Sequence, residues 1–510
     1  MKKLSLFFLP VILLVSFLLG SRMILSGDFF YLFDQARDYL LVKDILDTNN
    51  LTLIGTHSGL GGFFHGPLWL YMLSPVYVLG GGNPFSFTYF YIGLQLTTVL
   101  TAYLVGLKLY GEKGGILLSL LIALSPATWG TVPNTIGVNT VPLIFLGLFY
   151  FLIKFLRGNP NSFIFAAFFA GLSLQFETAL PLVLIPTMVV IFLLNKTSIK
   201  NLKIILLSLI SFVLSVSTFI LFDLRNNFLM TTAVFKAFTG GEKGKGYLEL
   251  GDRIPAHFNS LLGTYKSILF KEDFLLILLL VIIFIFAAFL VFKDRTKYKK
   301  EFLFLLLFPV LIFGFFLFYS YPIWPEYVLG LLVPVALAFY LSIVTVWKNI
   351  LGKILIILFF AITFFNVSIF IQNQYLQKYL QNNSSGSYLN QKAVVDWTYK
   401  DAGPTGKFGY FVYTPEIYTH GMDYLISWEA KNYPDEIFTA NKERTTYLIL
   451  YPHMANDEGA YDFWKKNTLK TNGKVILTKT FNGGITVEKL LIDKNEPEVD
   501  QNYYQGLIFR

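Results

Sequence analysis

The residues best placed to do chemistry lie in a polar stretch that follows the first apolar run of the chain. Asp34, Arg37 and Asp38 are three and four residues apart, so a helix carries them on one face. A carboxylate can take a proton from a hydroxyl, and a guanidinium can hold a phosphate or keep the carboxylate ionised. The structural alternative is that Asp34 is a helix N-cap and that the three side chains form only a local ion-pair cluster.

The segment after this predicted helix is rich in glycine and contains two histidines, His57 and His65. Glycine suits a backbone that must approach a ligand closely. Together with Asp34 or Asp38, the imidazoles could bind a divalent metal. Their spacing matches no defined metal site, and a role in loop structure or acceptor contact is favoured over metal binding.

Three further ionisable residues are candidates for contacts with a donor or an acceptor. Glu177 stands at the end of an apolar run, and an ionisable group near membrane depth suggests function, although it could simply be interfacial. Arg225 belongs to a long polar loop, where it could steer an anionic lipid headgroup or be an ordinary solvated cation. Glu326 begins a predicted helix and could line a donor pocket or only favour the helix N-terminus.

These residues must be positioned by elements embedded in a membrane. The chain has 510 residues, of which 55% are apolar and 14% charged, and its mean hydropathy is +0.57. That balance is too apolar for a water-soluble protein of this length. The absence of cysteine excludes disulfides, thiolate metal ligands and a cysteine nucleophile.

Apolar runs of roughly twenty residues predict membrane-spanning helices, and we expect about eleven. The first is at residues 4–19, and the others lie near 86–108, 114–130, 140–156, 161–177, 179–195, 202–222, 273–292, 302–320, 326–346 and 351–371. Alternate connections are enriched in Lys and Arg, which marks them as cytoplasmic. The N-terminus is then cytoplasmic, and the loops at 26–84 and 223–271 and the C-terminal region lie outside.

A change of composition near residue 372 predicts three units. Residues 1–371 form the transmembrane domain, residues 372–391 form a polar linker, and residues 392–510 form a small soluble α/β domain. A helix is expected around 392–400, and strands are expected at 408–413, 447–451 and 475–477. The predicted fold class is therefore mainly α, a polytopic membrane protein with a small extracytoplasmic α/β domain.

The first outer loop carries a family resemblance. An Asp-Gln-Ala-Arg-Asp segment at 34–38 enters an amphipathic helix, and His-Gly-Pro-Leu-Trp at 65–69 precedes the next apolar run. This arrangement resembles the GT-C glycosyltransferases, in the protein-mannosyltransferase and aminoarabinose-transferase-like branch. The resemblance implies a polyprenyl-phosphate sugar donor, transfer with inversion at the outer membrane face, and Asp34 in the place of the catalytic carboxylate. Gln35 stands where many members have a second acid.

We therefore expect a membrane glycosyltransferase with Asp34 as general base. The expected partners are membrane lipids, the lipid-linked donor and a protein, lipid or glycan acceptor, with no nucleic acid and no required cofactor. Two alternatives remain open at this point. A transporter or flippase of lipid-linked sugars would more often place ionisable groups or broken helices near mid-membrane. An inactive scaffold that anchors the outer domain is favoured if the missing second acid is essential.

Overall fold

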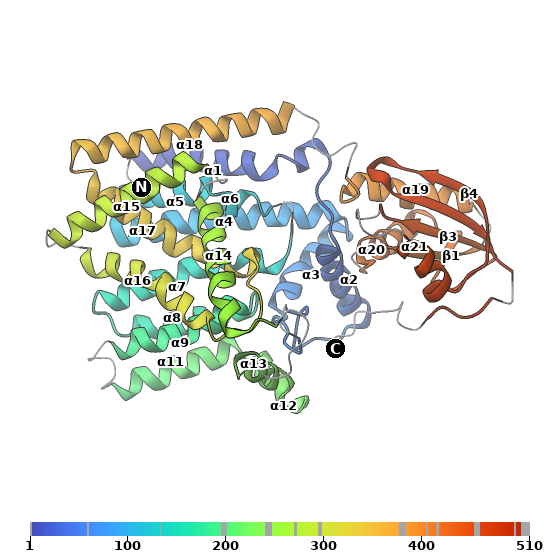
Figure 1. The fold of residues 1–510 in the computed structure, drawn as a ribbon, viewed down its shortest axis with the longest axis horizontal. Helices are drawn as coiled ribbons and strands as arrows, with labels where there is room; N and C mark the ends of the chain where they lie inside the picture. The colour runs from blue at the N-terminus through green and yellow to red at the C-terminus, as the bar shows by residue number, and fades with distance from the viewer. Residues whose placement is uncertain are drawn as a thin grey trace.

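A bundle of apolar helices and a smaller sheet-containing region make up the protein in a computed structural model (Figure 1). The structure describes residues 3–58, 61–132, 134–194, 201–239, 247–269, 273–293, 298–376, 384–403, 406–414, 418–452, 459–493 and 496–500. His453, part of the predicted linker at 377–383 and part of the second outer loop at 240–246 lie outside the described residues.

The secondary-structure elements of the described chain up to residue 376 are all helices, joined by loops. They are α1 (Lys3–Ser21), η1 (Ile24–Ser26), α2 (Phe33–Thr48), α3 (Leu68–Gly80), α4 (Pro84–Tyr110), α5 (Glu112–Leu124), α6 (Pro126–Trp129), η2 (Gly137–Thr140), α7 (Val141–Leu156), α8 (Ser162–Leu174), α9 (Ala179–Leu193), α11 (Leu202–Ser215), α12 (Ser217–Arg225), α13 (Leu229–Thr239), α14 (Leu250–Leu269), α15 (Phe274–Lys293), α16 (Lys299–Phe316), η3 (Pro325–Leu331), α17 (Leu332–Val346) and α18 (Ile350–Leu376).

Six helical stretches of the described chain are long and apolar enough to cross a membrane, which makes this a multi-pass membrane protein. A seventh is reached if α11 and α12, bent by 67° at their junction, form one broken span. Three shorter apolar helices, α3, α8 and α9, add to the bundle. Every predicted run contains a helix, but the count of about eleven spans is not confirmed, because several of these helices are too short or bent to span alone.

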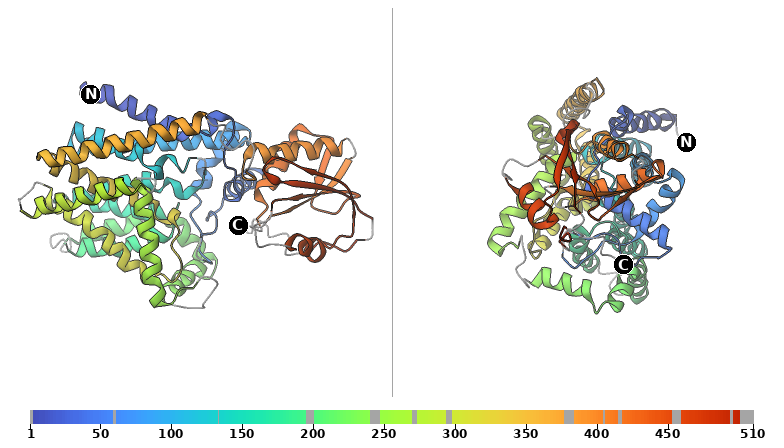
Figure 2. Two further views of the ribbon diagram at one scale, coloured as in Figure 1. Left: turned by 45° about the horizontal axis from the view of Figure 1, so that its top comes forward. Right: turned by 90° about the vertical axis from the view of Figure 1, so that its right-hand side faces the viewer.

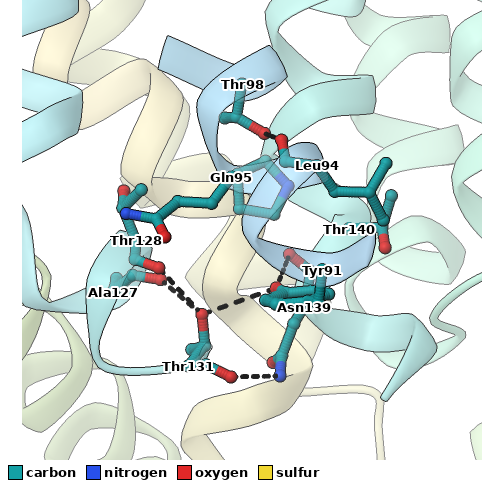
Figure 3. Close-up of a pocket in the computed structure, with 10 residues that line it drawn as sticks. Tyr91, Leu94, Gln95, Thr98, Ala127, Thr128, Thr131, Asn139 and Thr140 are labelled. Carbon is teal, nitrogen blue, oxygen red and sulfur yellow. Dashed lines mark hydrogen bonds between the residues drawn. The ribbon is translucent and has the colours of Figure 1, made fainter. Parts of the chain in front are cut away.

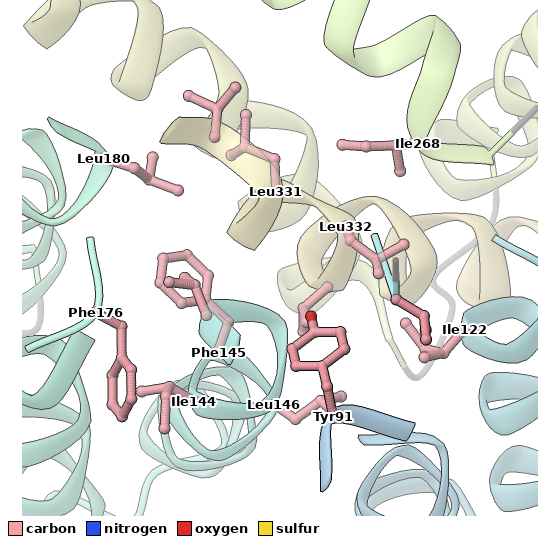
Figure 4. Packing of buried hydrophobic residues seen from close by; sticks show 14 of the residues in the cluster. Tyr91, Ile122, Ile144, Phe145, Leu146, Phe176, Leu180, Ile268, Leu331 and Leu332 are labelled. Atoms are coloured by element: carbon pink, nitrogen blue, oxygen red, sulfur yellow. The ribbon is translucent and has the colours of Figure 1, made fainter. Parts of the chain in front are cut away.

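The bundle core is dense in aromatic and branched side chains. Figure 4 shows Phe145 and Leu146 of α7 packed close to Leu331 and Leu332, where η3 meets α17. All four side chains are fully buried. Gly330 allows this approach, because a Cβ there would meet the ring of Phe145 at 2.8 Å. Packing of this kind holds the helices at fixed separations and gives the connecting loops a rigid base.

The helix α14 runs across the direction of α18 rather than along it (Figures 1 and 2). It is amphipathic: Arg253 and His257 are buried against the bundle, whereas Ile254 and Phe258 on its other face are about half exposed. An apolar stripe opposite a buried face is typical of a helix that lies along a membrane surface.

The C-terminal region is a mixed five-stranded sheet with helices. Its elements are α19 (Tyr388–Ala402), β1 (Gly406–Tyr413), α20 (His420–Glu429), η4 (Ala430–Asn432), β2 (Glu436–Thr439), β3 (Thr445–Leu450), α21 (Ala460–Phe463), η5 (Trp464–Leu469), β4 (Lys474–Thr480), η6 (Asn482–Gly484) and β5 (Thr486–Leu491). The strand order is β2-β1-β3-β5-β4, with β1 parallel to β2 and β3, and β5 antiparallel to β3 and β4. The predicted helix and three strands are confirmed as α19, β1, β3 and β4.

A buried carboxylate ties the loop between α1 and α2 to this region. Ser387 donates from Oγ to Asp28 Oδ2 at 2.6 Å, and the backbone N–H of Leu389 donates to Asp28 Oδ1 at 3.2 Å. Asp28 is fully buried, and Phe30 forms a bridge with Ser387 beside it. Because a buried polar group needs hydrogen-bond partners, this contact fixes the segment before α2 against the start of α19.

A second contact joins α20 to the turn between α3 and α4. Tyr424 donates to the carbonyl of Gly82 at 2.5 Å, and Trp428 donates to the carbonyl of Gly81 at 2.9 Å. Both glycines have positive φ, which glycine adopts without steric cost. The turn therefore presents its carbonyls to α20, which packs against α2 (Figure 1).

Candidate active site

The predicted outer-loop helix is α2, and it begins one residue before Asp34. Leu32 is the N-cap residue, and its backbone N–H donates to Oε1 of Gln35 at 3.1 Å. Asp34 lies in the first helical turn, where the helix dipole favours a carboxylate. The interpretation of Asp34 as an N-cap is therefore wrong. Gln35 also has a structural role here, because its side chain completes half of a capping box.

Most of the apolar face of α2 is buried within the protein. Tyr39 is fully buried; its ring stacks on Phe87 of α4 at 3.9 Å, and its hydroxyl contacts Thr135 Oγ1 at 2.5 Å. Ile45, on the apolar side of the same helix, is 7% exposed. The helix is thus packed between α3 and α20, and its acidic turn is held in one place.

Arg37 links the two carboxylates of α2. Its Nη1 donates to Asp34 Oδ1 at 2.7 Å, and its Nε and Nη2 donate to Asp38 Oδ1 at 3.3 and 3.1 Å. The other oxygen of Asp38 accepts from Nε1 of Trp69 at 2.9 Å. The structure therefore brings together Asp34, Arg37 and Asp38 as predicted from their spacing, and it adds Trp69 from the start of α3.

The two carboxylates differ sharply in exposure. The side chain of Asp34 is 37% exposed, whereas that of Asp38 is 2% exposed. Burial raises the pKa of Asp38 to about 6, although the charge of Arg37 opposes that shift. Asp34 can therefore meet a ligand, and Asp38 is placed to hold Arg37.

The glycine-rich segment folds back on itself beside this cluster. His57 bridges Phe64 in an antiparallel pair, and the backbone N–H of His65 donates to the carbonyl of Thr56 at 2.9 Å. Gly66 donates to the carbonyl of Gln175 at 3.1 Å, which anchors the segment on the end of α8. Gly66 allows the backbone to pack closely against Gln175, because a Cβ at this position would overlap the side chain of Gln175.

Three imidazoles lie within electrostatic range of Arg37. Burial lowers the pKa of His65 to about 3, and the charge of Arg37 adds to that shift. Burial and Arg37 also lower the pKa of His57, and they lower the pKa of His420 on α20 to about 4. At neutral pH all three rings are neutral hydrogen-bonding groups rather than cations.

His420 is the site residue that sequence reasoning missed. The ring of Phe33 stacks on Tyr418 at 5.2 Å, and Tyr418 stacks on His420 at 5.8 Å. These contacts place the start of α20 against the start of α2. The only sequence signal was that His420 shares the outer side with the other histidines.

No metal-binding group is found in the described part of the chain, where no three His, Asp or Glu side chains gather. His57 and His65 belong to the folded segment described above.

Glu177 is buried at the N-terminus of α9. It is 1% exposed and accepts from the backbone N–H groups of Ala179 at 2.9 Å and Leu180 at 3.0 Å. The hydroxyl of Tyr327 lies within electrostatic range of Glu177, Glu326 and Asp34. Glu177 and Glu326 therefore both lie near Tyr327. The carboxylate of Glu177 caps the N-terminus of α9.

Arg225 is not part of this cluster. Its side chain is exposed at the C-terminal end of α12, and among the described residues none of its hydrogen bonds or ion pairs reaches Asp34, Arg37 or Asp38.

A separate small cavity lies inside the bundle. Figure 3 shows it between α4 and the segment around α6, where Tyr91, Thr131 and Asn139 are joined by hydrogen bonds. Its volume is about 10 Å³, and the buried Oε1 of Gln95 and Oγ1 of Thr128 beside it have no protein partner. A space of that size with several polar groups suits a single water molecule.

Comparisons with known proteins reveal structural likeness only. No family model matches the sequence, and no curated protein matches it. The fold is similar to that of ArnT from Cupriavidus metallidurans bound to undecaprenyl phosphate, with a TM-score of 0.61 and 11% identity. The likeness covers 95% of this chain and 98% of the ArnT chain. The apo state of the same protein gives a TM-score of 0.56, also at 11% identity, over 95% and 97% of the two chains.

The oligosaccharyltransferase of Archaeoglobus fulgidus, in complex with zinc and sulfate, is also similar. Its TM-score is 0.51 at 11% identity, over 98% of this chain and 76% of the other. Both likenesses extend over the helical bundle and the C-terminal region together. The chain therefore has the GT-C fold.

Proposed function

We propose that this protein is a membrane glycosyltransferase that moves a sugar from a polyprenyl-phosphate donor to an acceptor hydroxyl. The observation that carries the proposal is the pairing of Arg37 with one exposed and one buried carboxylate at the start of α2. Its fold likeness to a protein solved with bound undecaprenyl phosphate supports the donor class. The outer membrane face is the side that the distribution of basic loops favours.

Asp34 acts as the general base. Its carboxylate takes the proton of the acceptor hydroxyl, and the hydroxyl oxygen then bonds to the anomeric carbon of the donor sugar. The bond between that carbon and the phosphate oxygen breaks, and its electron pair leaves with the polyprenyl phosphate. A single displacement of this kind inverts the anomeric centre and needs no second carboxylate, so Gln35 is compatible with activity.

Arg37 binds the leaving phosphate. A guanidinium has five N–H donors, and three of them serve Asp34 and Asp38. The second N–H groups of Nη1 and Nη2 are available to a phosphate oxygen as its charge develops. Asp38 is a positioning residue, because it fixes the guanidinium plane while Trp69 fixes Asp38.

A lipid-linked-sugar flippase is the second candidate, and one observation favours it. The 67° bend between α11 and α12 resembles the discontinuous helices of transporters. The two functions differ in whether the bond between sugar and phosphate is broken. The test is to supply the full chain in nanodiscs with radiolabelled polyprenyl-phosphate sugars and a membrane extract as acceptor source. Release of polyprenyl phosphate with label in a new product supports the transferase, and an intact donor throughout contradicts it.

A further inference from the structure

The exposed apolar face of α11 continues beyond the end of that helix. On α11 a stripe is formed by Leu206, Ile210 and Leu214, which are four residues apart and between 49% and 65% exposed. After the 67° bend, Leu221 and Leu224 of α12 are 52% and 63% exposed. Figure 1 shows α12 and α13 at the end of α11 that lies toward the C-terminal region. Because exposed apolar side chains on a helix of a membrane bundle face lipid, lipid is also expected along α12.

The length of α11 places the start of α12 at membrane depth. Lys203, in the first turn of α11, is exposed, and such a cation marks the polar edge of the leaflet farther from the C-terminal region. The 14 residues of α11 rise about 21 Å, whereas the apolar core of a bilayer is roughly 30 Å thick. The chain is therefore still at or within the boundary of the nearer leaflet when α12 begins.

A fixed turn between α12 and α13 exposes a further aromatic side chain. Asn227 and Phe228 have φ values of 52° and 58°, a region that residues with a Cβ adopt only at a cost. Buried Asp223 holds the turn, because Oδ1 accepts from the backbone N–H of Met230 at 2.7 Å and Oδ2 accepts from that of Thr231 at 2.9 Å. Phe228 is nevertheless 54% exposed. Backbone strain around an exposed aromatic side chain indicates a role at the surface.

The exposed charge of α12 and α13 is positive. Between residues 217 and 239 the charged residues are Asp223, Arg225 and Lys236. Asp223 is buried and accepts the hydrogen bonds described above, whereas Arg225 and Lys236 are exposed. Cations beside an exposed apolar face are typical of a segment that lies on an anionic lipid surface.

The opposite face of α12 covers the glycine-rich segment of the first loop. The ring centroids of Phe219 and Phe63 are 6.1 Å apart, and those of Phe222 and Phe64 are 5.7 Å apart. All four residues are buried. The position of α12 in the membrane therefore bears directly on the segment that lies beside the α2 cluster.

We propose that α12 and α13 dock on the leaflet nearer to the C-terminal region. Their exposed apolar side chains lie among the acyl chains, and Arg225 and Lys236 bind the phosphates of anionic phospholipid head groups. The partner is bulk membrane phospholipid, which is separate from the proposed sugar-linked donor, and docking does not depend on sugar transfer. The docked helices hold the glycine-rich segment at a fixed depth beside the α2 cluster.

The first experiment measures the depth of Phe228. Because the chain has no cysteine, Phe228→Cys in the full chain can carry one fluorescent label at a known position. The protein is placed in nanodiscs, and quenching by nitroxide-labelled phospholipids is compared with quenching by aqueous iodide. Phe463→Cys is the matched control, because Phe463 is an aromatic residue of α21 that is 67% exposed.

We expect the label at position 228 to be quenched by lipid and protected from iodide, and the label at position 463 to behave in the opposite way. Equal lipid quenching at the two positions would overturn the proposal. Protection of position 228 from both quenchers would also overturn it, because protein, such as a second copy of the chain, would then cover this face.

The second experiment tests the choice of lipid with the same label at position 228. Nitroxide-labelled phosphatidylglycerol and phosphatidylcholine are supplied at equal mole fractions, and the ratio of their quenching gives the local preference for the anionic lipid. Adding Arg225→Gln or Lys236→Gln should lower that preference about fivefold each. Lys466→Gln is the control, because Lys466 is an exposed cation on η5 of the C-terminal region. Equal quenching by the two lipids, or a preference that neither substitution lowers, would overturn the head-group contacts.

Discussion

The guanidinium of Arg37 donates to the Oδ1 of Asp34 at 2.7 Å, and the same group is held from its other side by the buried Asp38. Asp34 is the exposed member of this arrangement, so it alone can meet an acceptor hydroxyl. In the proposed mechanism this arrangement separates two roles: the exposed carboxylate takes the proton, and the buried one orients the cation proposed to bind phosphate.

Replacement of Asp34 by Asn should remove the base and keep the shape of the site. We expect turnover to fall by about 10²–10⁴-fold, the usual contribution of a general base, while the melting temperature stays unchanged. Turnover is measured as polyprenyl phosphate released by purified protein in nanodiscs. Asp47→Asn is the control, since Asp47 lies on the same helix and pairs only with Lys43 in the described contacts. Wild-type turnover in Asp34→Asn would refute the mechanism.

The pH dependence of turnover should report Asp38, whose pKa is raised by burial to about 6. Above that pH the carboxylate is ionised and holds Arg37; below it the added proton removes the charge that orients the guanidinium. We therefore expect wild-type turnover to decrease as the pH falls through about 6. In Asp38→Asn, turnover at neutral pH should fall by up to roughly tenfold. The plot of turnover against pH should then show no step near pH 6. A step of wild-type size in the variant would show that another group titrates.

The contact through Asp28 should stabilise the docking of the C-terminal region. Asp28→Ala leaves the hydroxyl of Ser387 and the N–H of Leu389 without their buried acceptor, at a cost of about 1–3 kcal/mol. We expect a lower melting temperature and faster proteolytic cleavage between α18 and α19. Asp47→Ala, an exposed site, is the control. An unchanged melting temperature together with unchanged cleavage would mean that other contacts hold the two regions together.

Two variants of Glu177 distinguish a helix-capping role from a catalytic role for its carboxylate. Gln at this position keeps an oxygen that can accept from Ala179 and Leu180, so Glu177→Gln should retain most of the turnover and the stability. Glu177→Ala loses the cap, which should cost about 1 kcal/mol of stability. If Glu177→Gln abolishes turnover at an unchanged melting temperature, the carboxylate takes part in the chemistry.

Local spacing was enough to predict the cluster on α2, because residues three and four apart must share a face of a helix. The apolar runs likewise predicted the positions of the membrane helices. A helical pattern predicted α19, and strand-like runs predicted β1, β3 and β4. The break between α11 and α12 was missed, since an apolar run of spanning length does not reveal a bend.

Contacts between distant segments were beyond the reach of local patterns. Trp69 was quoted in the motif of the first loop, but its hydrogen bond to Asp38 depends on how α3 packs against α2. The placement of His420 near Arg37 depends on α20, which has only a short helical pattern and was not predicted. The cavity of about 360 Å³ that Phe30 and Tyr31 line together with Thr419 and Tyr451 combines residues from both ends of the chain for the same reason.

Native mass spectrometry of the full chain and its Asp34→Asn variant, purified in detergent, tests the central claim most directly. The account predicts a polyprenyl-phosphate sugar bound to the protein, at equal or higher occupancy in the variant, because the variant holds the donor but cannot consume it. If neither protein carries such a lipid while other membrane lipids remain bound, the donor assignment and the transferase account are contradicted.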